Sequence, residues 1–280
     1  MKIQRSQQDQ APLLYLVPTP IGNLEDMSPR AIATLQQVDC ILCEDTRVTK
    51  MLLSHFHINA PLVSYHIFNE DKRTEEVLAL LEQQQNIALV SDAGMPLISD
   101  PGYLLVRSAI EKGYRVISLP GPNAALTALI ASGLPTEKFM FYGFLSSKPN
   151  KRTQEITTLR DYPYTIIFHE APHRIQDTLE ELYRLLGDRE AVIARELTKT
   201  YEEYTRGTLG ELKELTYKGE IILIIRGAVE PHLVTSLNEG TLHDHYQYYL
   251  DQGLTDKDAM KQVASDRKIA KSEVYKVVHQ

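Results

Sequence analysis

Residues 43–47 (CEDTR) bring together side chains that could transfer a proton or hold a phosphate. Glu44 and Asp45 are candidates for a general base, and Arg47 is a candidate phosphate ligand. An ordinary helix N-terminus would explain the two carboxylates, because acidic side chains interact favourably with the helix dipole there. A cation in that same turn opposes the dipole, so Arg47 favours a functional site.

A second charged group lies at residues 194–199 (ARELTK), which contain Arg195, Glu196 and Lys199. Lys199 could bind phosphate or adjust the pKa of a neighbouring carboxylate, and Glu196 is a further candidate proton acceptor. Structural ion pairing would also explain this group, and the sequence leaves both interpretations open.

The segment from His169 to His173 reads HEAPH and matches the H-E-x-x-H pattern of zinc hydrolases. That pattern binds zinc when both histidines lie on one helical face. Pro172 lies between them, and the preceding residues favour a strand. We therefore expect a strand-to-helix turn without a metal site and keep Glu170 as a candidate proton acceptor. A zinc hydrolase stays an alternative function.

Cys40 and Cys43 form a C-x-x-C pair, which could indicate redox chemistry or half of a zinc site. They lie in an expected strand, where residues three apart point to opposite faces of the sheet. They cannot bind one metal together, so packing in the core explains them better.

Three segments are unusually rich in proline and glycine for simple connections: residues 18–26 (PTPIGNLED), 91–102 (SDAGMPLISDPG) and 119–133 (LPGPNAALTALIASG). None has the G-x-G-x-x-G or G-x-x-x-x-G-K spacing of dinucleotide or nucleoside triphosphate sites. We interpret them as binding loops, although the first would also serve as a tight strand-to-helix turn and the third as a hinge.

The elements that position these segments follow an alternating strand and helix pattern from Leu13 to about Gly133, which predicts a parallel sheet. Ligands of such sheets bind beyond the carboxyl ends of the strands, where the unusual loops lie. The expected strands are 13–17, 38–43, 62–66, 86–91 and 115–120, and the expected helices open at Ser28-Pro29 and cover about 46–56, 74–85, 102–112 and 123–132.

After Gly133 the pattern changes to aromatic-rich strands, which predicts a second α/β domain with a mixed sheet. Strands are expected at 139–145, 164–170, 190–198 and 220–227, with helices near 173–186 and 209–216. Residues 228–242 suggest a linker before a small C-terminal helical module. The expected domains are residues 1–120, 121–230 and 241–280.

The chain has 280 residues, 43% of them hydrophobic, and a net charge of −7, so no overall attraction to nucleic acid is expected. A polyanion would have to meet local cations, and residues 146–160 and 259–280 are the two basic stretches. Solvated surface would explain both, but their common positive charge on an acidic protein favours phosphate contacts. No apolar run is long enough for a membrane span or a secretion signal, so we expect a cytoplasmic protein.

Six strings spread over most of the chain together resemble the tetrapyrrole-methylase superfamily of S-adenosylmethionine (SAM) enzymes. Within it the chain is most similar to the branch that 2′-O-methylates a cytidine in the decoding region of bacterial 16S rRNA, and its single-glycine first loop favours this branch. The strings are LVPTPIGNLEDMSPRA (16–31), EDTRVTKMLL (44–53), SDAGMPLISDPG (91–102), LPGPNAALTALIASGLP (119–135), FHEAPHR (168–174) and ARELTK (194–199).

The resemblance implies SAM as cofactor without a metal, 16S rRNA in the small ribosomal subunit as partner, and a homodimer. A tetrapyrrole C-methyltransferase is the alternative within the fold, and the basic C-terminal stretch argues against it. Met95 replaces the threonine expected after S-D-A-G. We place catalysis at Glu44, Asp45, Arg47 and Lys199, and SAM contacts at Pro20, Gly22, Asn23, Asp92, Ala93, Gly94, Pro96, Pro122, Asn123 and Ala124.

Overall fold

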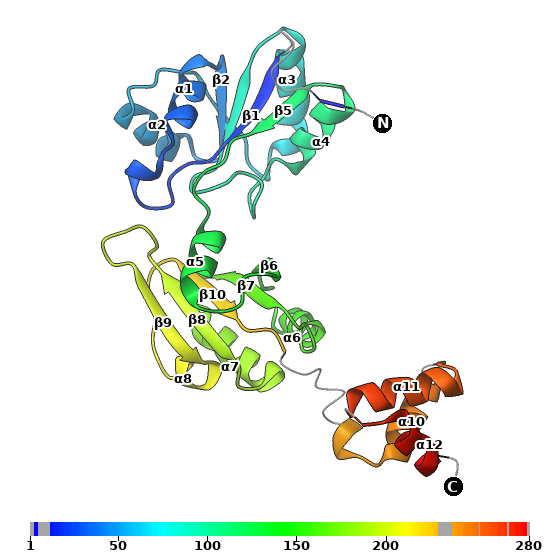
Figure 1. Cartoon of the computed structure of the whole chain (residues 1–280). Helices are drawn as coiled ribbons and strands as arrows, with labels where there is room; N and C mark the ends of the chain where they lie inside the picture. The colour runs from blue at the N-terminus through cyan, green and yellow to red at the C-terminus, as the bar shows by residue number, and fades with distance from the viewer. Residues whose placement is uncertain (1–2, 5–11, 229–236, 252, 268, 279–280) are drawn as a thin grey trace.

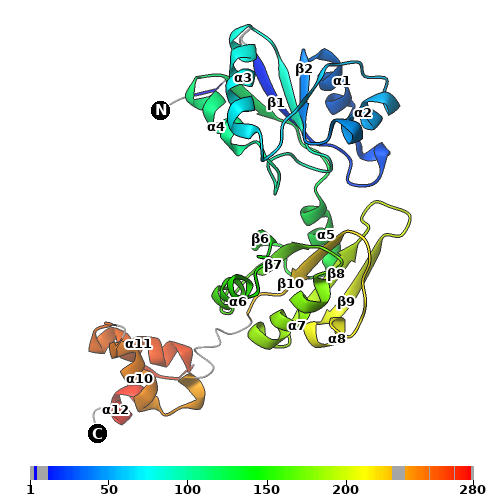
Figure 2. The same cartoon turned by 180° about the vertical axis from the view of Figure 1, so that it is seen from behind.

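The computed structural model describes residues 3–4, 12–228, 237–251, 253–267 and 269–278, which form two five-stranded sheets and a group of C-terminal helices (Figures 1 and 2). All strand pairs of the first sheet are parallel, in the order β3-β2-β4-β1-β5, as the sequence predicts. Its strands are β1 (Leu13–Val17), β2 (Cys40–Cys43), β3 (Leu62–Ser64), β4 (Ile87–Val90) and β5 (Arg115–Ser118).

Helices cover both faces of this sheet and bury a hydrophobic cluster on each. Leu35 of α1 and Leu53 of α2 pack on one face together with Cys43, whereas α3, α4 and Cys40 belong to the cluster on the other face. The two cysteines therefore pack on opposite faces and are free, as predicted. The helices of this half are α1 (Pro29–Gln37), α2 (Thr46–His55), α3 (Glu70–Glu82) and α4 (Tyr103–Glu111), with a short 3-10 helix, η1 (Leu24–Asp26).

Two helix starts show how local sequence sets the boundaries. The Ser28 hydroxyl caps α1 by accepting from the backbone N–H of Ala31 at 3.1 Å, and Pro29 occupies the first turn, as predicted. Helix α3 begins at Glu70, four residues before the predicted start, because Glu70 and Asp71 place negative charge in the first turn.

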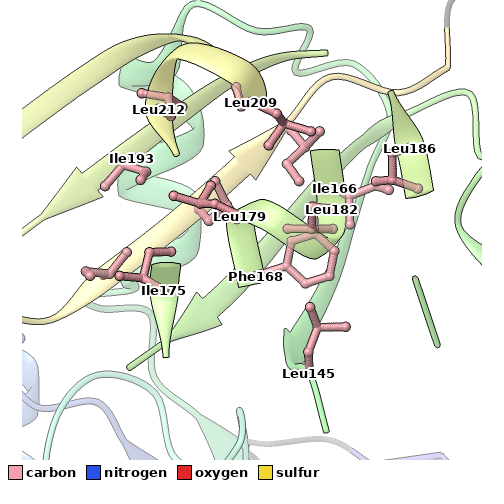
Figure 3. Close-up of a cluster of buried hydrophobic side chains, with 14 of the residues drawn as sticks. Leu145, Ile166, Phe168, Ile175, Leu179, Leu182, Leu186, Ile193, Leu209 and Leu212 are labelled. Atoms are coloured by element: carbon pink, nitrogen blue, oxygen red, sulfur yellow. The ribbon is translucent and has the colours of Figure 1, made fainter. Parts of the chain in front are cut away.

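The second sheet has the order β6-β7-β10-β8-β9 and is mixed, as predicted: β6 and β7 are parallel and the other neighbours antiparallel. Leu179 and Leu182 of α7 belong to the cluster on one face together with Phe168 (Figure 3). The elements are β6 (Phe139–Phe144), α6 (Pro149–Thr158), β7 (Thr165–Glu170), α7 (Ile175–Leu186), β8 (Glu190–Arg195), β9 (Glu203–Thr208), α8 (Leu209–Leu212) and β10 (Ile221–Ile225).

Helix α5 (Ala124–Ser132) packs on the other face of the second sheet and lies between the two sheets in both views (Figures 1 and 2). Ile21, from the loop after β1, is buried in the same cluster as Leu129 of α5 and Ile222 of β10. Burial of apolar surface from both halves in one cluster fixes the first loop against the second sheet. The binding loops of the first half are thereby held over the strand ends of the second.

Three details of the second half correct the sequence-based prediction. Residues 149–158, within the basic stretch, form α6, and residues 203–208 form the edge strand β9, neither of which was predicted. Both are too polar to show a clear apolar period; α6 has Ile156 as its buried residue. The helix predicted at 209–216 ends at Leu212.

The C-terminal helices pack around a cluster of their own that includes Tyr246, Val263 and Val274, which confirms a small helical module. They are α10 (Leu242–Asp251), α11 (Asp256–Asp266) and α12 (Lys271–Val278). Most of the predicted linker, residues 229–236, lies outside the described residues. No helix in the described part of the chain has the length and apolar character that crossing a membrane requires.

A buried polar network ties α10 to the end of α11. His245 Nε2 lies 3.2 Å from Asp266 Oδ2, and Arg267 Nε donates to His245 Nδ1 at 3.1 Å. Nδ1 accepts from a guanidinium and carries no proton, so the single N–H of the neutral ring is on Nε2, which donates to Asp266. Burial, together with Arg267, accordingly lowers the pKa of His245. The module is thus positioned by specific hydrogen bonds as well as by its apolar cluster.

Candidate active site

The first and fourth loops of the parallel sheet are joined at the carboxyl ends of β1 and β4. The backbone N–H of Thr19 donates to the Gly94 carbonyl at 2.9 Å, and the Gly94 N–H donates back at 3.0 Å. The hydroxyl of Thr19 also donates to the carbonyl of Ser91 at 3.0 Å, and the Ser91 hydroxyl donates to Gly94 at 2.7 Å. Three of these hydrogen bonds join the two predicted binding loops, and the fourth holds the turn of the fourth loop, so the loops form one rigid unit.

The joined loops separate two cavities. The larger, which we call the central pocket, has a volume of about 410 Å³ and lies between the loops and the second sheet. It is in the usual size range of small-molecule sites, and a small cavity bordered by Met95 adjoins it. The central pocket is lined by Ile21, Ala93, Ile98, Ser99, Asp100, Ala124, Phe144, His169, Glu170, Ala171, Pro172, Leu197, Glu220, Ile221 and Ile222.

The smaller, which we call the α2 pocket, has a volume of about 260 Å³ and lies between the same loops and helix α2. Neighbouring residues of one loop face different cavities: Ile21 lines the central pocket, whereas Pro20 and Gly22 line the α2 pocket. The α2 pocket is lined by Thr19, Pro20, Gly22, Leu24, Val48, Thr49, Met51, Leu52, His55, Ser91 and Asp92.

Seven of the ten residues predicted to contact a cofactor line these cavities, and the other three do not. Those in or beside the central pocket are Ala93 and Ala124, with Gly94 and Asn123 in the adjoining small cavity. Those in the α2 pocket are Pro20, Gly22 and Asp92. Those lining none of these three cavities are Asn23, whose side chain accepts from Glu25 N–H at 3.1 Å, Pro96 and Pro122.

The charged residues after β2 are arranged around the start of α2. Asp45 caps the helix and accepts two hydrogen bonds from the Arg47 guanidinium, at 3.0 Å and 2.6 Å. These bonds from Arg47 lower the pKa of Asp45 to about 2, so its carboxylate stays ionised. The backbone N–H of Asp45 also donates to Asp92 at 3.2 Å, which joins this turn to the fourth loop. Arg47 keeps 88% of its side chain exposed.

Lys199 lies on the opposite side of the first loop. Its ammonium is 3.0 Å from Glu220 and 3.3 Å from Glu196, so the two ion pairs raise its pKa although burial opposes this. Glu196 and Thr198 adopt left-handed backbone conformations, with φ of 50° and 65°. Such conformations are costly for residues with side chains and are common at binding sites. The cluster is therefore ion-paired, as one interpretation predicts, and Leu197 and Glu220 of this region line the central pocket.

Asp100 is a residue that the sequence did not single out. It lines the central pocket, and burial together with Glu44 and Asp92 raises its pKa to about 6. A carboxyl with this pKa is suited to accept protons near neutral pH. The direction of its side chain depends on left-handed backbone at Leu97 (φ 70°) and Ser99 (φ 69°), which no sequence signal reveals.

His169 also lines the central pocket, where its ring packs edge-on against Phe141 and Phe144. Its buried Nε2 has no hydrogen-bond partner among the described residues, and burial lowers its pKa. His169 lies in β7 and His173 in the turn before α7, so the two histidines do not share a helical face. A neutral imidazole with one free nitrogen is thus available to a ligand.

Glu170, the other predicted proton acceptor of this segment, is occupied by structural contacts. Its carboxylate accepts from the Thr178 hydroxyl at 2.6 Å and from the Ala171 N–H at 2.9 Å, and Arg174 lies 3.4 Å away. Only 3% of the residue is exposed. These contacts fix the turn that presents His169 to the pocket, and they use the carboxylate oxygens that a base would need.

Replacing Gly22 by Ala is expected to weaken SAM binding in the central pocket by about 5–150-fold, although Gly22 itself lines the α2 pocket. The added methyl group would displace residues 197–199, including Leu197 of the central pocket, and such overpacking costs roughly 1–3 kcal/mol. A Cβ there would lie 2.6 Å from Lys199 Cγ and 2.8 Å from the Leu197 carbonyl oxygen. Calorimetry with SAM would measure the change. Gly240→Ala is the control, since its Cβ would meet nothing closer than 3.6 Å. Equal affinities for both variants would contradict a tight contact at Gly22.

Comparison with known proteins places the chain in a family. The model of the tetrapyrrole (corrin/porphyrin) methylases matches residues 13–213. A Halalkalibacterium halodurans protein named ribosomal RNA small subunit methyltransferase I is 50% identical over 100% of both chains. Proteins of the same name from Bacillus subtilis and Escherichia coli O157:H7 are 46% identical (95% of this chain, 94% of the relative) and 50% identical (81% and 82%).

Solved structures of low sequence identity share the fold. A diphthine synthase superposes with a TM-score of 0.60 at 14% identity, covering 77% of this chain and 90% of its own. A cobalt precorrin-4 methyltransferase gives 0.58 at 16% identity, covering 76% and 94%. The chain therefore belongs to the tetrapyrrole methylase family and, within it, to the group of proteins named ribosomal RNA small subunit methyltransferase I.

Proposed function

We propose that this protein transfers a methyl group from SAM to the ribose 2′-hydroxyl of a cytidine in the decoding region of 16S rRNA, in the small ribosomal subunit. The observation that carries the proposal is the full-length similarity to proteins named ribosomal RNA small subunit methyltransferase I. The shared family and the presence of a ligand-sized pocket at its strand ends support the use of SAM. A cytoplasmic enzyme is consistent with this substrate.

The lining of the central pocket fits SAM. Ile98, Phe144 and Leu197 supply apolar contact for a purine ring, and the free Nε2 of His169 is an unused hydrogen-bonding atom for a polar group. Gly94, with φ of 85°, lets the backbone turn close to the ligand at the loop junction. When bound, SAM would supply an electrophilic methyl group on a sulfonium. Ala93 and Ala124 would contact it directly, with Gly94 and Asn123 behind them.

The charged residues around the two pockets would accept the proton and bind the RNA phosphates. Asp100 lines the central pocket and would accept the proton of the ribose hydroxyl, and burial, with Glu44 and Asp92, keeps its pKa raised. Arg47, exposed near the start of α2, and Lys199, beside Gly22 of the first loop, would hold RNA phosphates, which guanidinium and ammonium groups bind well. Asp45 orients Arg47 through two hydrogen bonds. These residues require no metal for the reaction.

RNA would be captured by cations outside the pockets, because the net charge of −7 gives no overall attraction. Lys148 and Lys151 are exposed at the start of α6, whereas Arg152 in the same stretch is paired with Glu181. The C-terminal module carries further exposed lysines on α11 and α12. In a homodimer, the module of one subunit could reach RNA bound at the other.

The test is transfer of tritium from labelled SAM into small subunits from a strain that lacks this enzyme, followed by mapping of the modified nucleotide. We expect label on one cytidine ribose and SAM binding by calorimetry. SAM binding combined with methylation of a tetrapyrrole and not of rRNA would favour the alternative within the fold. Absence of SAM binding would refute the proposal.

A further inference from the structure

The α2 pocket is separate from the central pocket but shares its walls. Asp92 and Ala93 are neighbours in the fourth loop and face the α2 pocket and the central pocket respectively. The same division occurs at Pro20 and Ile21 in the first loop. A molecule in the α2 pocket would therefore lie one loop thickness from a ligand of the central pocket. Such adjacency suits the two substrates of one transfer reaction.

The walls of the α2 pocket are mainly apolar and partly exposed. Leu24 of η1 faces a helical wall formed by Val48, Met51 and Leu52 of α2. Leu24, Val48 and Met51 are exposed to 40%, 38% and 68%, and exposed apolar side chains gathered in one place mark an interaction site. Apolar walls of this kind take up a planar ring, as in enzymes that extract a base from its stack.

Polar groups in the same pocket offer hydrogen bonds to the edge of such a ring. Thr49 is only 2% exposed. Its hydroxyl lies near the Cys43 thiol, which is a weak hydrogen-bonding group, and makes no hydrogen bond of ordinary length within the described residues. Asp92 contributes a carboxylate that the N–H of Asp45 orients at 3.2 Å. Carboxylates accept hydrogen bonds from the exocyclic amine of cytosine, whereas uracil carries a carbonyl oxygen at that position.

The rim of the pocket can meet the backbone of the same nucleotide. Arg47, the second residue of α2, is exposed and precedes Val48, a lining residue, and the Lys199 side chain packs against Gly22, another lining residue. Cations at the rim and a carboxylate inside match a nucleotide whose phosphate stays outside while its base enters. An apolar side chain of a protein partner would use the walls but neither of these charges.

We propose that the α2 pocket binds the flipped base of the acceptor nucleotide, with Asp92 accepting from the exocyclic amine of cytosine. This assignment rests on the proposed function and adds a base-reading site to it. Of the predicted cofactor contacts, Asp92 is thereby reassigned to the RNA substrate.

Two variants test the pocket. Val48→Phe fills the α2 pocket from helix α2. It should raise the KM for small subunits about tenfold or more, because the flipped base then has no pocket to enter, while the Kd for SAM stays the same. Ser54→Phe is the matched control: it adds the same side chain to the same helix at an exposed position that does not line the pocket. The control should behave as the unmodified enzyme does.

Asp92→Asn tests the reading of the base. The unmodified enzyme should prefer cytidine to uridine at the target position, and the variant should lose about tenfold of that preference, the usual worth of one base-edge contact. The assay compares single-turnover rates on subunits reconstituted with either nucleotide. SAM affinity should be unchanged in the variant.

The outcomes separate this proposal from the proposed function. If the unmodified enzyme labels no rRNA, the function itself fails. If it labels rRNA but Val48→Phe keeps the normal KM and Asp92→Asn keeps the cytidine preference, only the base pocket is refuted. A weaker Kd for SAM in either variant would assign the α2 pocket to the cofactor and overturn the proposal.

Discussion

Asp100→Asn is expected to lower the single-turnover rate of methyl transfer by about 10²–10⁴-fold, the usual worth of a general base, while raising the melting temperature at pH 7.5. The rate falls because an amide cannot accept the proton. Stability rises because partial burial, together with Glu44 and Asp92, raises the pKa of Asp100 to about 6, so the ionised carboxylate destabilises the folded state at pH 7.5. A purely structural residue would show both quantities falling together.

The raised pKa of Asp100 also predicts how the stability gain and the rate of methyl transfer depend on pH. A carboxyl whose pKa is higher in the folded than in the unfolded state stabilises the protein at low pH, and this contribution is lost as the pH rises through the folded-state value. The stability gain of Asp100→Asn should therefore appear above about pH 6 and vanish near pH 4. The rate of the unmodified enzyme should rise tenfold per pH unit below pH 6 and then level off.

Glu75→Gln is the control for this experiment, because Glu75 is an exposed carboxylate of α3 away from both pockets. It should leave the rate, its pH profile and the melting temperature close to those of the unmodified enzyme. An unchanged rate in Asp100→Asn, or a lower melting temperature at pH 7.5, would assign the proton transfer to another group.

The parallel sheet and its binding loops could be predicted because the determining signals are local. Five short apolar runs alternate with amphipathic stretches, and the loops after β1 and β4 contain prolines and glycines at a density that simple connections do not need. The rule that ligands lie beyond the carboxyl ends of parallel strands then predicts the place of the pocket. The position of the central pocket agrees with that rule.

The division of these loops between two cavities could not be predicted. Whether Ile21 or Gly22 faces the second sheet depends on a loop conformation fixed by the Thr19–Gly94 hydrogen bonds, which join residues far apart in sequence. Asp100 could not be predicted for the same reason, because the direction of its side chain follows from the left-handed backbone at Ser99. Sequence patterns report which residues share a segment, whereas tertiary contacts decide which way each side chain points.

Removal of the C-terminal module should separate SAM binding from RNA binding. A chain ending at Ala228 keeps the backbone hydrogen bond from Ala228 to Tyr162, at 2.8 Å, and every described residue of the four clusters around the two sheets. The module has its own cluster, so the body should fold and bind SAM with nearly unchanged affinity. Affinity for small subunits should fall, as filter binding would measure.

Salt dependence tests whether the lost affinity is electrostatic. The slope of log K against log salt should flatten by about 0.7–0.9 for each phosphate contact removed. A full-length chain with four exposed lysines replaced by glutamine keeps the helices and isolates the charge effect; the positions are Lys257, Lys261, Lys271 and Lys276. If these lysines all contact phosphate, this variant should flatten the slope by about 3. Unchanged slopes in both proteins would leave Lys148 and Lys151 on α6 as the cations that meet RNA, since Arg152 is already paired with Glu181 at 2.6 Å.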